Sequence, residues 1–327
     1  MIKDSRKKVM VVGSFVMDLI VTTERFPERG ETVLGKTFSS APGGKGANQA
    51  VQMAKLGLDV HFLGKLGDDN FGKILLESAK DSGVNVDRVM TDGTFSSVGN
   101  VQIEKSSEGT ENRIIVVPGA NMEITPEDVA FLEDDIRNYD LLVQQQEIPL
   151  EINRQIRRYA NQQGVPVLLN PAPGYKLKDE DFATIDYIVP NETELLLQCG
   201  ETKTQLENHE EAEHFARKLL AKGSKNVIVT LGSQGSLWVT EGESIYKEAV
   251  PGIKVLDPTA AGDSFIGALS YALLHDFNKA DALAFANVVG GITVSQMGAQ
   301  TSLCDKAFII QWMKEHNQDA LAKQLED

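Results

Sequence analysis

The chain has 327 residues, of which 42% are hydrophobic, and a formal net charge of −15 at pH 7. This length suffices for a large core, so we expect one large α/β domain or two smaller ones. The acidic balance argues against nucleic acid or an anionic membrane as a partner, because both require clustered Lys and Arg. Anionic ligands must therefore be bound by local features.

The cysteines, histidines and apolar runs exclude several further classes. Cys199 and Cys304 are the only cysteines and lack metal-site spacing, which suggests a reducing compartment, the cytoplasm. The five histidines form no HExxH pattern. Asp18 interrupts the first apolar run, and no run approaches about 18 apolar residues, so we expect neither a signal peptide nor a membrane span.

Short apolar segments followed by turn residues recur along the chain and predict buried strands. These segments are 9–12, 60–63, 141–143, 166–169, 187–189 and 227–229. Helical patterns lie between most of them, which predicts βαβ units and a mostly parallel sheet covered on both faces. Ligands are expected at the carboxyl ends of the strands. The residues after Trp312 are expected to form a polar helix that frays.

Two segments break this alternation and indicate antiparallel β-structure. They are 31–40 and 98–117, the second with a Ser-Ser-Glu-Gly turn between two strands. Because they flank residues 43–48 and follow Asp18, a small sheet built from them could cover a ligand as a lid. Its apolar face could also pair with a second subunit. An ordinary edge hairpin is the alternative.

The segment APGGKGANQAVQMAKLG, at 41–57, places glycines before a helix with small residues on its packing face. It is not a Walker A loop, because the glycine spacing differs and no Ser or Thr follows the lysine. The glycines would let backbone amides approach a polar ligand, and Lys45 and Asn48 offer donors for hydroxyls. A plain strand-to-helix turn explains the segment equally well.

The segment YIVPNETE reads as a strand and then an N-x-x-E pair that opens a helix. Asn191 and Glu194 then share one helix face. This suits a carboxylate that holds the waters of a hydrated magnesium ion while the amide faces a phosphate. A capping box explains the pair without a ligand. The next strand, in VIVTLGSQG, runs into a Gly-Ser turn that suits a nucleotide phosphate or is a plain loop.

The segment DPTAAGDSFIGA predicts a helix that begins near Gly262, with apolar residues on every face over 265–274. Asp263 therefore lies in its first turn. The small residues Ala261 and Gly262 would let an anion approach amides that have no helical partner, at the positive end of the helix dipole. The same dipole favours an acidic residue there without any ligand.

Six motifs in register resemble those of the ribokinase-like carbohydrate kinases, also called the phosphofructokinase-B family. They are GGKGAN, QQQEIP, NPAP, PNETE, TLGSQG and DPTAAGDSF. The resemblance covers nearly the whole chain. It implies one three-layer α/β/α domain over 1–327, with a mostly parallel central sheet and a small β-sheet lid formed by about 16–44 and 95–120.

The resemblance also implies an activity. It implies transfer of the γ-phosphate of ATP to the 5-hydroxyl of D-ribose, with Mg²⁺ and K⁺, in a cytoplasmic homodimer that pairs through the lid strands. Asp263 matches the general base, and the amides of Ala260, Ala261 and Gly262 match an anion hole for the transferring phosphoryl group.

Further positions take their roles from the same resemblance. Those matching the sugar site are Asp18, Gly44, Lys45, Gly46, Ala47, Asn48, Glu147 and Asp263. Those matching the nucleotide site are Asn191, Thr230, Leu231, Gly232, Ser233, Gln234, Gly235, Gly262 and Asn287. Glu194 matches the residue that organises magnesium through water, and the potassium site is matched by Asp257, Thr259, Thr293, Gln296, Gly298 and Ser302, several through backbone carbonyls.

Two residues depart from the family pattern. Val16 stands where an Asn is common, and it cannot hydrogen-bond a sugar hydroxyl. A site without that bond favours a sugar without that hydroxyl, so 2-deoxyribose is an alternative to ribose. Pro258 replaces a Thr and removes one backbone donor but keeps its carbonyl.

Activities other than pentose phosphorylation also remain open. Another sugar or a nucleoside is a possible substrate. A regulator that binds sugar without catalysis is a further alternative, against which the intact Gly262-Asp263 pair argues. A nicotinamide-dependent oxidoreductase would need a GxGxxG turn after the first strand, and the residues that begin at Gly13 do not provide one.

Overall fold

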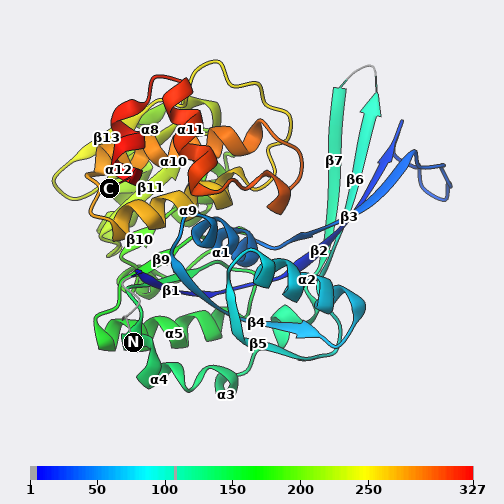
Figure 1. The fold of residues 1–327 in the computed structure, drawn as a ribbon, viewed down its shortest axis with the longest axis horizontal. Coiled ribbons are helices and arrows are strands. Elements are labelled where there is room, and N and C mark those ends of the chain that lie inside the picture. Colours follow the sequence, from blue (N-terminus) through cyan, green and yellow to red (C-terminus); the bar gives the residue numbers. More distant parts are fainter. Residues whose placement is uncertain (1–5, 107–108, 327) are drawn as a thin grey trace.

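The computed structural model describes residues 6–106 and 109–326. They form a nine-stranded sheet between helices and a separate four-stranded sheet that projects from the body (Figure 1). The strands are β1 (Lys8–Val12), β2 (Val16–Thr23), β3 (Thr37–Gly43), β4 (Asp59–Gly67), β5 (Asn85–Gly93), β6 (Val98–Ser106), β7 (Gly109–Val117), β8 (Leu141–Gln144), β9 (Val167–Leu169), β10 (Tyr187–Ile188), β11 (Asn226–Thr230), β12 (Ser236–Val239) and β13 (Ser244–Lys247).

The helices alternate with the strands of the large sheet along most of the chain. The α-helices are α1 (Lys45–Lys55), α2 (Asn70–Asp81), α3 (Pro126–Val129), α4 (Leu132–Asp135), α5 (Leu150–Gln163), α6 (Asp179–Phe182), α7 (Glu192–Cys199), α8 (His209–Ala221), α9 (Ala261–Leu274), α10 (Lys279–Val294), α11 (Lys306–Glu315) and α12 (Asp319–Glu326). The 3₁₀ helices are η1 (Gly119–Glu123), η2 (Ile136–Asn138), η3 (Gly232–Gln234) and η4 (Gln300–Ser302).

The large sheet has the strand order β13-β12-β11-β10-β9-β8-β1-β4-β5. All pairs from β5 to β11 are parallel, whereas β12 and β13 add an antiparallel edge. Every strand expected from an apolar segment is present, and the three-layer α/β/α fold is confirmed. Strands β5, β12 and β13 were not expected. The half-exposed positions of β5 and β13 do not require a continuous apolar run, and β12 is only four residues long and begins at a serine.

Successive residues of β1 explain why helices cover both faces. Val9 and Val11 pack into a core with α1, α2 and α9 to α12. Met10 and Val12 pack on the opposite face with α3, α4 and α5. Because adjacent side chains of a strand point to opposite faces, an uninterrupted apolar strand needs cover on both. A third cluster places α6, α7 and α8 against β9 to β12.

The small sheet has the strand order β3-β2-β6-β7, with β2 and β6 parallel and the other pairs antiparallel. The strand expected over 31–40 in fact begins at Thr37 and continues to Gly43. The 98–117 hairpin is present as β6 and β7, and its turn includes residues 107–108, which lie outside the described residues. The two inner strands each start beside the central sheet, near the carboxyl end of β1 (Figure 1).

Two helix boundaries matter for the site. Helix α1 begins at Lys45 with Gly44 as its N-cap, so residues 45–48 form a first helical turn and not the expected loop. Helix α9 begins at Ala261, and its residues from Asp263 to Ala272 are all buried, as the apolar pattern predicted.

The expectation of a fraying polar helix after Trp312 is wrong. Leu321, Ala322 and Leu325 of α12 are buried in the main core, because they lie on one face of that helix. Within residues 6–106 and 109–326, no helix combines the length and apolarity that crossing a bilayer requires.

Candidate active site

The carboxylate of Asp263 is held by two side-chain amides of α1. Its Oδ2 accepts a hydrogen bond from Nδ2 of Asn48 at 2.9 Å, and its Oδ1 accepts one from Nε2 of Gln49 at 2.9 Å. Asp263 is only 8% exposed. Burial raises the pKa of Asp263, while the charge of Lys45 and these two donors act in the opposite direction. The result is a fixed acidic side chain at the start of α9.

Lys45 supplies the positive charge near this carboxylate. Burial alone would lower the pKa of Lys45, but the carboxylates of Asp263, Glu147 and Glu194 outweigh burial and raise it. The ammonium group therefore stays charged among three acidic side chains. Lys45 and Asp263 also line the same small cavity.

Glu147 is anchored at the N-terminus of α1. Its Oε2 accepts a hydrogen bond from the backbone N–H of Lys45 at 3.0 Å and another from the hydroxyl of Ser14. The Ser14 oxygen in turn accepts from the N–H of Gly46 at 3.4 Å. A Cβ at Gly46 would lie 2.6 Å from the backbone nitrogen of Ser14, so only glycine permits this approach. Glu147 is thereby oriented by the helix it faces.

Asp18 projects from β2 between two glycines of the neighbouring strands. A Cβ at Gly43 would lie 2.8 Å from Oδ2 of Asp18, and one at Gly99 would lie still closer to Oδ1. Burial, and after it the nearby charge of Glu147, raises the pKa of Asp18 to about 6. The sequence alone singled out Asp18 and Glu147 through the family resemblance, and the structure brings them close enough for their charges to interact.

The N-terminus of α9 has an unusual cap. Ala260 has φ 61°, a left-handed conformation, and its side chain makes no capping bond. Among the described residues the N–H of Ala261 donates a long bond of 3.3 Å to Pro258, and none is found for the N–H of Gly262. A Cβ added at Gly262 would meet nothing within 4 Å. These small residues leave the amides at the positive end of α9 open to an anion.

Asn191 and Glu194 form a reciprocal capping box at the start of α7. Oδ1 of Asn191 accepts from the N–H of Glu194 at 2.8 Å, and Oε2 of Glu194 accepts from the N–H of Asn191 at 3.0 Å. The alternative weighed from the sequence is therefore present, yet both residues also line the small cavity beside Asp263. Burial raises the pKa of Glu194, and the bond from Asn191 opposes that rise.

Two adjoining cavities meet at the start of α9. The smaller, of about 200 Å³, is lined by polar groups that include Lys45, Glu194 and Asp263. The larger is about 550 Å³. They share Asn191, Thr230, Pro258, Ala261 and Gly262 in their walls. A ligand in the larger cavity can therefore extend into the smaller one and reach Asp263.

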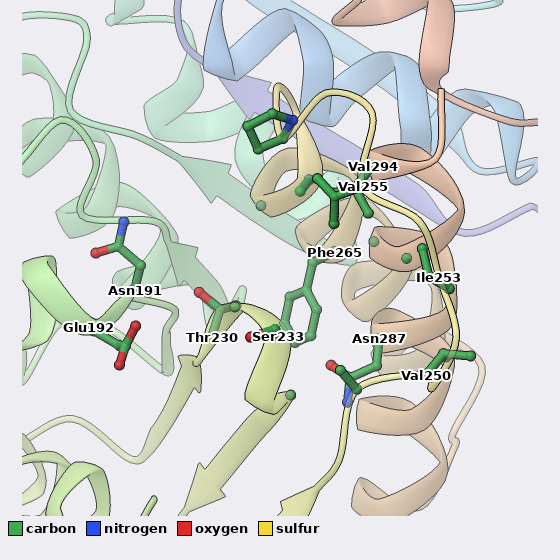
Figure 2. A pocket seen from close by; sticks show the side chains of 18 of the residues that line it. Asn191, Glu192, Thr230, Ser233, Val250, Ile253, Val255, Phe265, Asn287 and Val294 are labelled. Atoms are coloured by element: carbon green, nitrogen blue, oxygen red, sulfur yellow. The ribbon is translucent and has the colours of Figure 1, made fainter. Parts of the chain in front are cut away.

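The larger cavity is walled mainly by backbone and by small or apolar side chains. Figure 2 shows its side chains around Phe265, with Asn191, Glu192 and Thr230 on one side and Val250, Ile253 and Asn287 on the other. Gly232, Ser233, Gly235, Gly290 and Gly291 complete much of the wall. Such a cleft suits a flat, partly apolar group with a phosphate end.

Not every residue expected at the nucleotide site lines this cavity. Thr230, Gly232, Ser233 and Gly235 do, but the side chain of Leu231 is buried in the core around α8. The carbonyl of Gln234 instead accepts from the Tyr246 hydroxyl at 2.5 Å, and Gln234 is not among the lining residues.

Asn287 lies in the wall of the cavity, with its side-chain amide already engaged. Its Nδ2 donates to the carbonyls of Lys247 and Glu248, each at 3.1 Å. It therefore fixes the chain that follows β13 along one edge of the cavity.

Three of the six residues expected to bind potassium are linked through Asp257. Its Oδ2 accepts from the N–H of Gly298 at 2.9 Å, and its Oδ1 accepts from the N–H and hydroxyl of Thr259 at 3.0 and 2.6 Å. The hydroxyls of Thr293 and Ser302 donate to carbonyls of their own segments. The oxygen-rich composition fits a hard monovalent cation.

The expected potassium set contains one side chain directed elsewhere. Nε2 of Gln296 donates to Sγ of Cys304 at 2.9 Å. Oxygen atoms are what a cation would require of Gln296, so the amide nitrogen bonded to Cys304 plays no part in such a site. Among the described residues no cluster of three or more His, Cys, Asp or Glu has metal-binding geometry, and a hydrated Mg²⁺ at Glu194 needs none because it keeps most of its waters.

Three polar residues of the site were missed from the sequence. Ser14 orients Glu147, Gln49 bonds Asp263, and Oδ1 of Asn170 accepts from Gln49 at 3.3 Å. A signal was available, because Ser14 and Asn170 each follow an apolar strand at its carboxyl end. Gln49 is one of the polar residues, with Asn48 and Gln52, on the buried side of α1.

The fold and this site together define a phosphotransferase of the α/β class, with a polar pocket and an adjoining cleft that meet at a helix N-terminus. The chain belongs to the pfkB family of carbohydrate kinases, whose sequence model matches residues 6–306. It is therefore an enzyme that phosphorylates a carbohydrate.

Individual relatives resemble it over most of their length. The chain is 40% identical over 306 residues to a ribokinase of Schizosaccharomyces pombe, a match that covers 90% of this chain and 94% of that protein. It is 34% identical over 298 residues to a deoxyribokinase of Salmonella typhimurium, which covers 90% and 94%. The structure of Arabidopsis thaliana ribokinase complexed with ribose and ATP matches with a TM-score of 0.84 at 34% identity, covering 94% of this chain and 99% of that one.

Proposed function

We propose that this chain is an ATP-dependent kinase that transfers the γ-phosphate of ATP to the 5-hydroxyl of D-ribose. The observation that carries the proposal is the position of Asp263. Its buried carboxylate faces the polar cavity, beside the open amides of α9 and at the junction with the larger cleft. A general base, an anion-binding helix end and a nucleotide-sized cavity are thus adjacent. The resemblance to ribokinases supports ribose as the sugar.

Sugar binding is assigned to acidic and amide side chains from three elements. Asp18 on β2 and Glu147 after β8 accept hydrogen bonds from sugar hydroxyls, and the first turn of α1 supplies Asn48 as a further partner. Gly44, Gly46 and Ala47 allow close approach of that turn, and Lys45 adds a donor.

In the transfer step one phosphorus–oxygen bond forms, another breaks, and one proton moves. The 5-oxygen of the sugar forms a bond to the γ-phosphorus while the bond from that phosphorus to its bridging oxygen breaks, and ADP leaves with the bond electrons. The hydroxyl proton passes to the carboxylate of Asp263. The amides of Ala260, Ala261 and Gly262, with Lys45 nearby, stabilise the charge on the transferring group.

The nucleotide is assigned to the cleft of Figure 2. Thr230, Gly232, Ser233 and Gly235 would face its phosphates and ribose, and Asn287 fixes the opposite edge. Glu194, whose carboxylate reaches the cavity from α7, would hold waters of Mg²⁺, which supplies charge neutralisation for the phosphates. K⁺ bound near Asp257 and Gly298 would hold the segment before α9 in shape.

A second candidate substrate is 2-deoxyribose. Val16 opens β2 and is only 5% exposed, two residues before Asp18. Its side chain offers no hydrogen bond to a sugar hydroxyl in this wall of the site, so a sugar without the 2-hydroxyl leaves no partner unsatisfied. The resemblance to a deoxyribokinase at 34% identity is in line with this alternative.

The small sheet is proposed to act as a lid and as a dimer contact. Asp18 projects from β2, and the neighbouring strands β3 and β6 flank its carboxylate, so the sheet stands over the proposed sugar side of the site. It also carries exposed apolar side chains, with Phe38 68% and Ile115 65% exposed. A second copy of the sheet would cover them. Light scattering at micromolar concentration tests this, and a monomer would remove the dimer proposal.

The decisive experiment measures sugar-stimulated ATP consumption in a coupled assay. Ribose, 2-deoxyribose, fructose and nucleosides are compared, each with potassium or sodium. We expect a pentose to give the highest kcat/KM and potassium to exceed sodium. A strong preference for a hexose or nucleoside would overturn the substrate but spare the mechanism. No ATP consumption with any sugar would favour a regulator that only binds sugar.

A further inference from the structure

Gln49 has no exposed surface and links three parts of the fold. From α1, its Nε2 donates to Oδ1 of Asp263 at 2.9 Å and lies 3.3 Å from Oδ1 of Asn170. Its Oε1 accepts from Nε2 of Gln145 at 2.6 Å. Gln145 follows β8 and Asn170 follows β9, so the amide joins two strand ends to the start of α9.

The carboxylate of Asp263 and the bond from Gln145 together set the direction of this amide. If the Gln49 amide were turned over, its oxygen would face the Asp263 carboxylate, and its NH₂ would face the NH₂ of Gln145. Both contacts would be repulsive. Gln49 and Gln145 are both fully buried, and unsatisfied buried polar groups are costly. Gln145 therefore holds Gln49 with its donor toward Asp263.

The two donors on Asp263 have different surroundings. Asn48 bonds Oδ2 and also belongs to the helical turn assigned to the sugar, whereas Gln49 bonds Oδ1 from a fully enclosed position. Each carboxylate oxygen keeps a further lone pair with which it can accept a proton. Donors on both oxygens favour the ionised form and fix the plane of the carboxylate.

We propose that Gln49, oriented by Gln145, is a positioning residue that fixes the Asp263 carboxylate for proton acceptance. This inference rests on the proposed role of Asp263 as general base. Gln49 would touch neither sugar nor nucleotide, and it acts only through Asp263. Small displacements of a reacting group reduce rates strongly, which is why a fixed carboxylate plane matters.

Other groups set the charge balance around Asp263 and are left intact by a change at Gln49. Lys45 on the same helix favours the ionised carboxylate, whereas the nearby charges of Glu147 and Glu194 oppose ionisation. Burial acts in the same sense as these two acids. Removing the Gln49 donor should therefore move the acid limb of the kcat profile to higher pH.

The test compares Gln49→Met with Gln52→Met. Gln52 is an equally buried amide on the same helix, and its Nε2 donates to the carbonyl of Cys304 at 3.0 Å, away from Asp263. For Gln49→Met we expect kcat to fall about 10- to 100-fold, with KM for sugar and ATP within about threefold. The acid limb of kcat should also shift upward. Gln52→Met should change neither.

A second variant keeps the inference testable if Gln49→Met does not fold. Gln145→Met removes only the bond that orients Gln49, and it should lower kcat less than Gln49→Met while shifting the acid limb in the same direction. Asp263→Asn serves as the reference. If Asp263→Asn were inactive but the Gln49 and Gln145 variants kept native kcat and pH profiles, this inference alone would fail. Native turnover in Asp263→Asn would instead remove the proposed function.

Discussion

The two halves of the site are formed by different kinds of chemical groups. The proposed sugar side consists of side chains that hydrogen-bond one another, such as Ser14 with Glu147 and Gln49 with Asp263. The nucleotide side is a cleft of about 550 Å³ walled largely by glycines, backbone and apolar side chains. A side-chain network distinguishes individual hydroxyls, because an unmatched partner is left unsatisfied. A cleft of backbone and apolar surface selects a ligand by its shape. The phosphates of that ligand are then bound by helix ends and turns.

This difference indicates how each half should respond to substitution. Changes to side chains that would touch the sugar should alter which sugar is accepted and its KM. Changes at the start of α9, where the halves meet, and at the residues that hold Asp263 should alter turnover. Substitutions of Asp263, Asp18, Gly262 and Val16 should therefore have distinct effects on turnover, KM and sugar preference.

Asp263→Asn should lower kcat about 1,000-fold or more, because the amide cannot accept the hydroxyl proton. Asn has the same shape and can still accept from Asn48 or Gln49, so the fold should persist. Turnover is measured in the coupled assay and folding by circular dichroism. A folded variant with near-native turnover would remove Asp263 as the base.

Asp18→Asn should raise KM for the sugar about 10- to 100-fold, since a charged acceptor for hydroxyls is lost. The amide fits between Gly43 and Gly99, where a larger side chain would not. KM for ATP should change little, because the cleft lies at the other end of the site. An equal rise in both KM values would contradict the division between the halves.

Gly262→Ala should separate stability from turnover. The added Cβ would meet nothing within 4 Å, so the fold should tolerate it, and alanine in a helix is favoured over glycine by up to about 1 kcal/mol. The methyl group would nevertheless obstruct an anion at the helix end, and kcat should fall about tenfold. Gly242→Ala, also free of close contacts but in the turn between β12 and β13, is the control and should leave kcat unchanged. An unchanged kcat in both variants would argue against the anion hole.

Val16→Asn should raise the ratio of kcat/KM for ribose to kcat/KM for 2-deoxyribose by about tenfold. The new amide would hydrogen-bond the 2-hydroxyl, which only ribose has. Val16→Ala is the matched control, since it changes volume without adding a hydrogen bond. Competition between the two sugars measures the ratio directly. If the ribose to 2-deoxyribose ratio of kcat/KM were equal in the two variants, residue 16 would not contact the 2-hydroxyl.

The pH dependence of sugar capture should reflect Asp18. With a pKa of about 6 this carboxyl is ionised at pH 7 and is progressively protonated below 6, so acceptor strength for hydroxyls is lost. From pH 7 to 5.5 the ionised fraction falls about fourfold, and kcat/KM for the sugar should fall in proportion.

The same titration affects stability with the opposite sign. The folded-state pKa of Asp18 lies above its unfolded value, so lowering the pH through 6 adds stability at this residue. Activity should therefore fall without a matching loss of Tm from this group. A pH profile in Asp18→Asn identical to that of the wild type would contradict the assignment.

The parallel strands from β4 to β11 were predictable because they are largely buried on both faces, whereas the four-residue strand β12 was missed although it is buried. Runs such as 9–12 must be apolar at every position, and this gives a strong local pattern. Strand β5 was not predicted, since its exposed positions carry Asp87 and Arg88 and interrupt any such run. The start of α9 was predicted to within one residue because small residues precede a wholly apolar helix.

The site was only partly predictable for a different reason. Residues assigned by resemblance, such as Asp18 and Glu147, occupy motif positions, but Gln49 and Ser14 act through other side chains and leave no ligand-binding pattern. The direction of a side chain in a turn is also not encoded locally. The 3₁₀ turn after β11 sends Leu231 into the core, so its side chain does not line the cleft.

Asp18 is a residue of β2, and β2 is hydrogen-bonded to both β3 and β6. The carboxylate is consequently part of the framework of the small sheet and cannot be withdrawn from the sugar side without shifting that sheet. A pentose that engages Asp18 would tether the sheet to the body of the enzyme. Binding of the pentose and closure of the small sheet over the site would then occur together. Water could not reach the phosphoryl group while the sugar is bound.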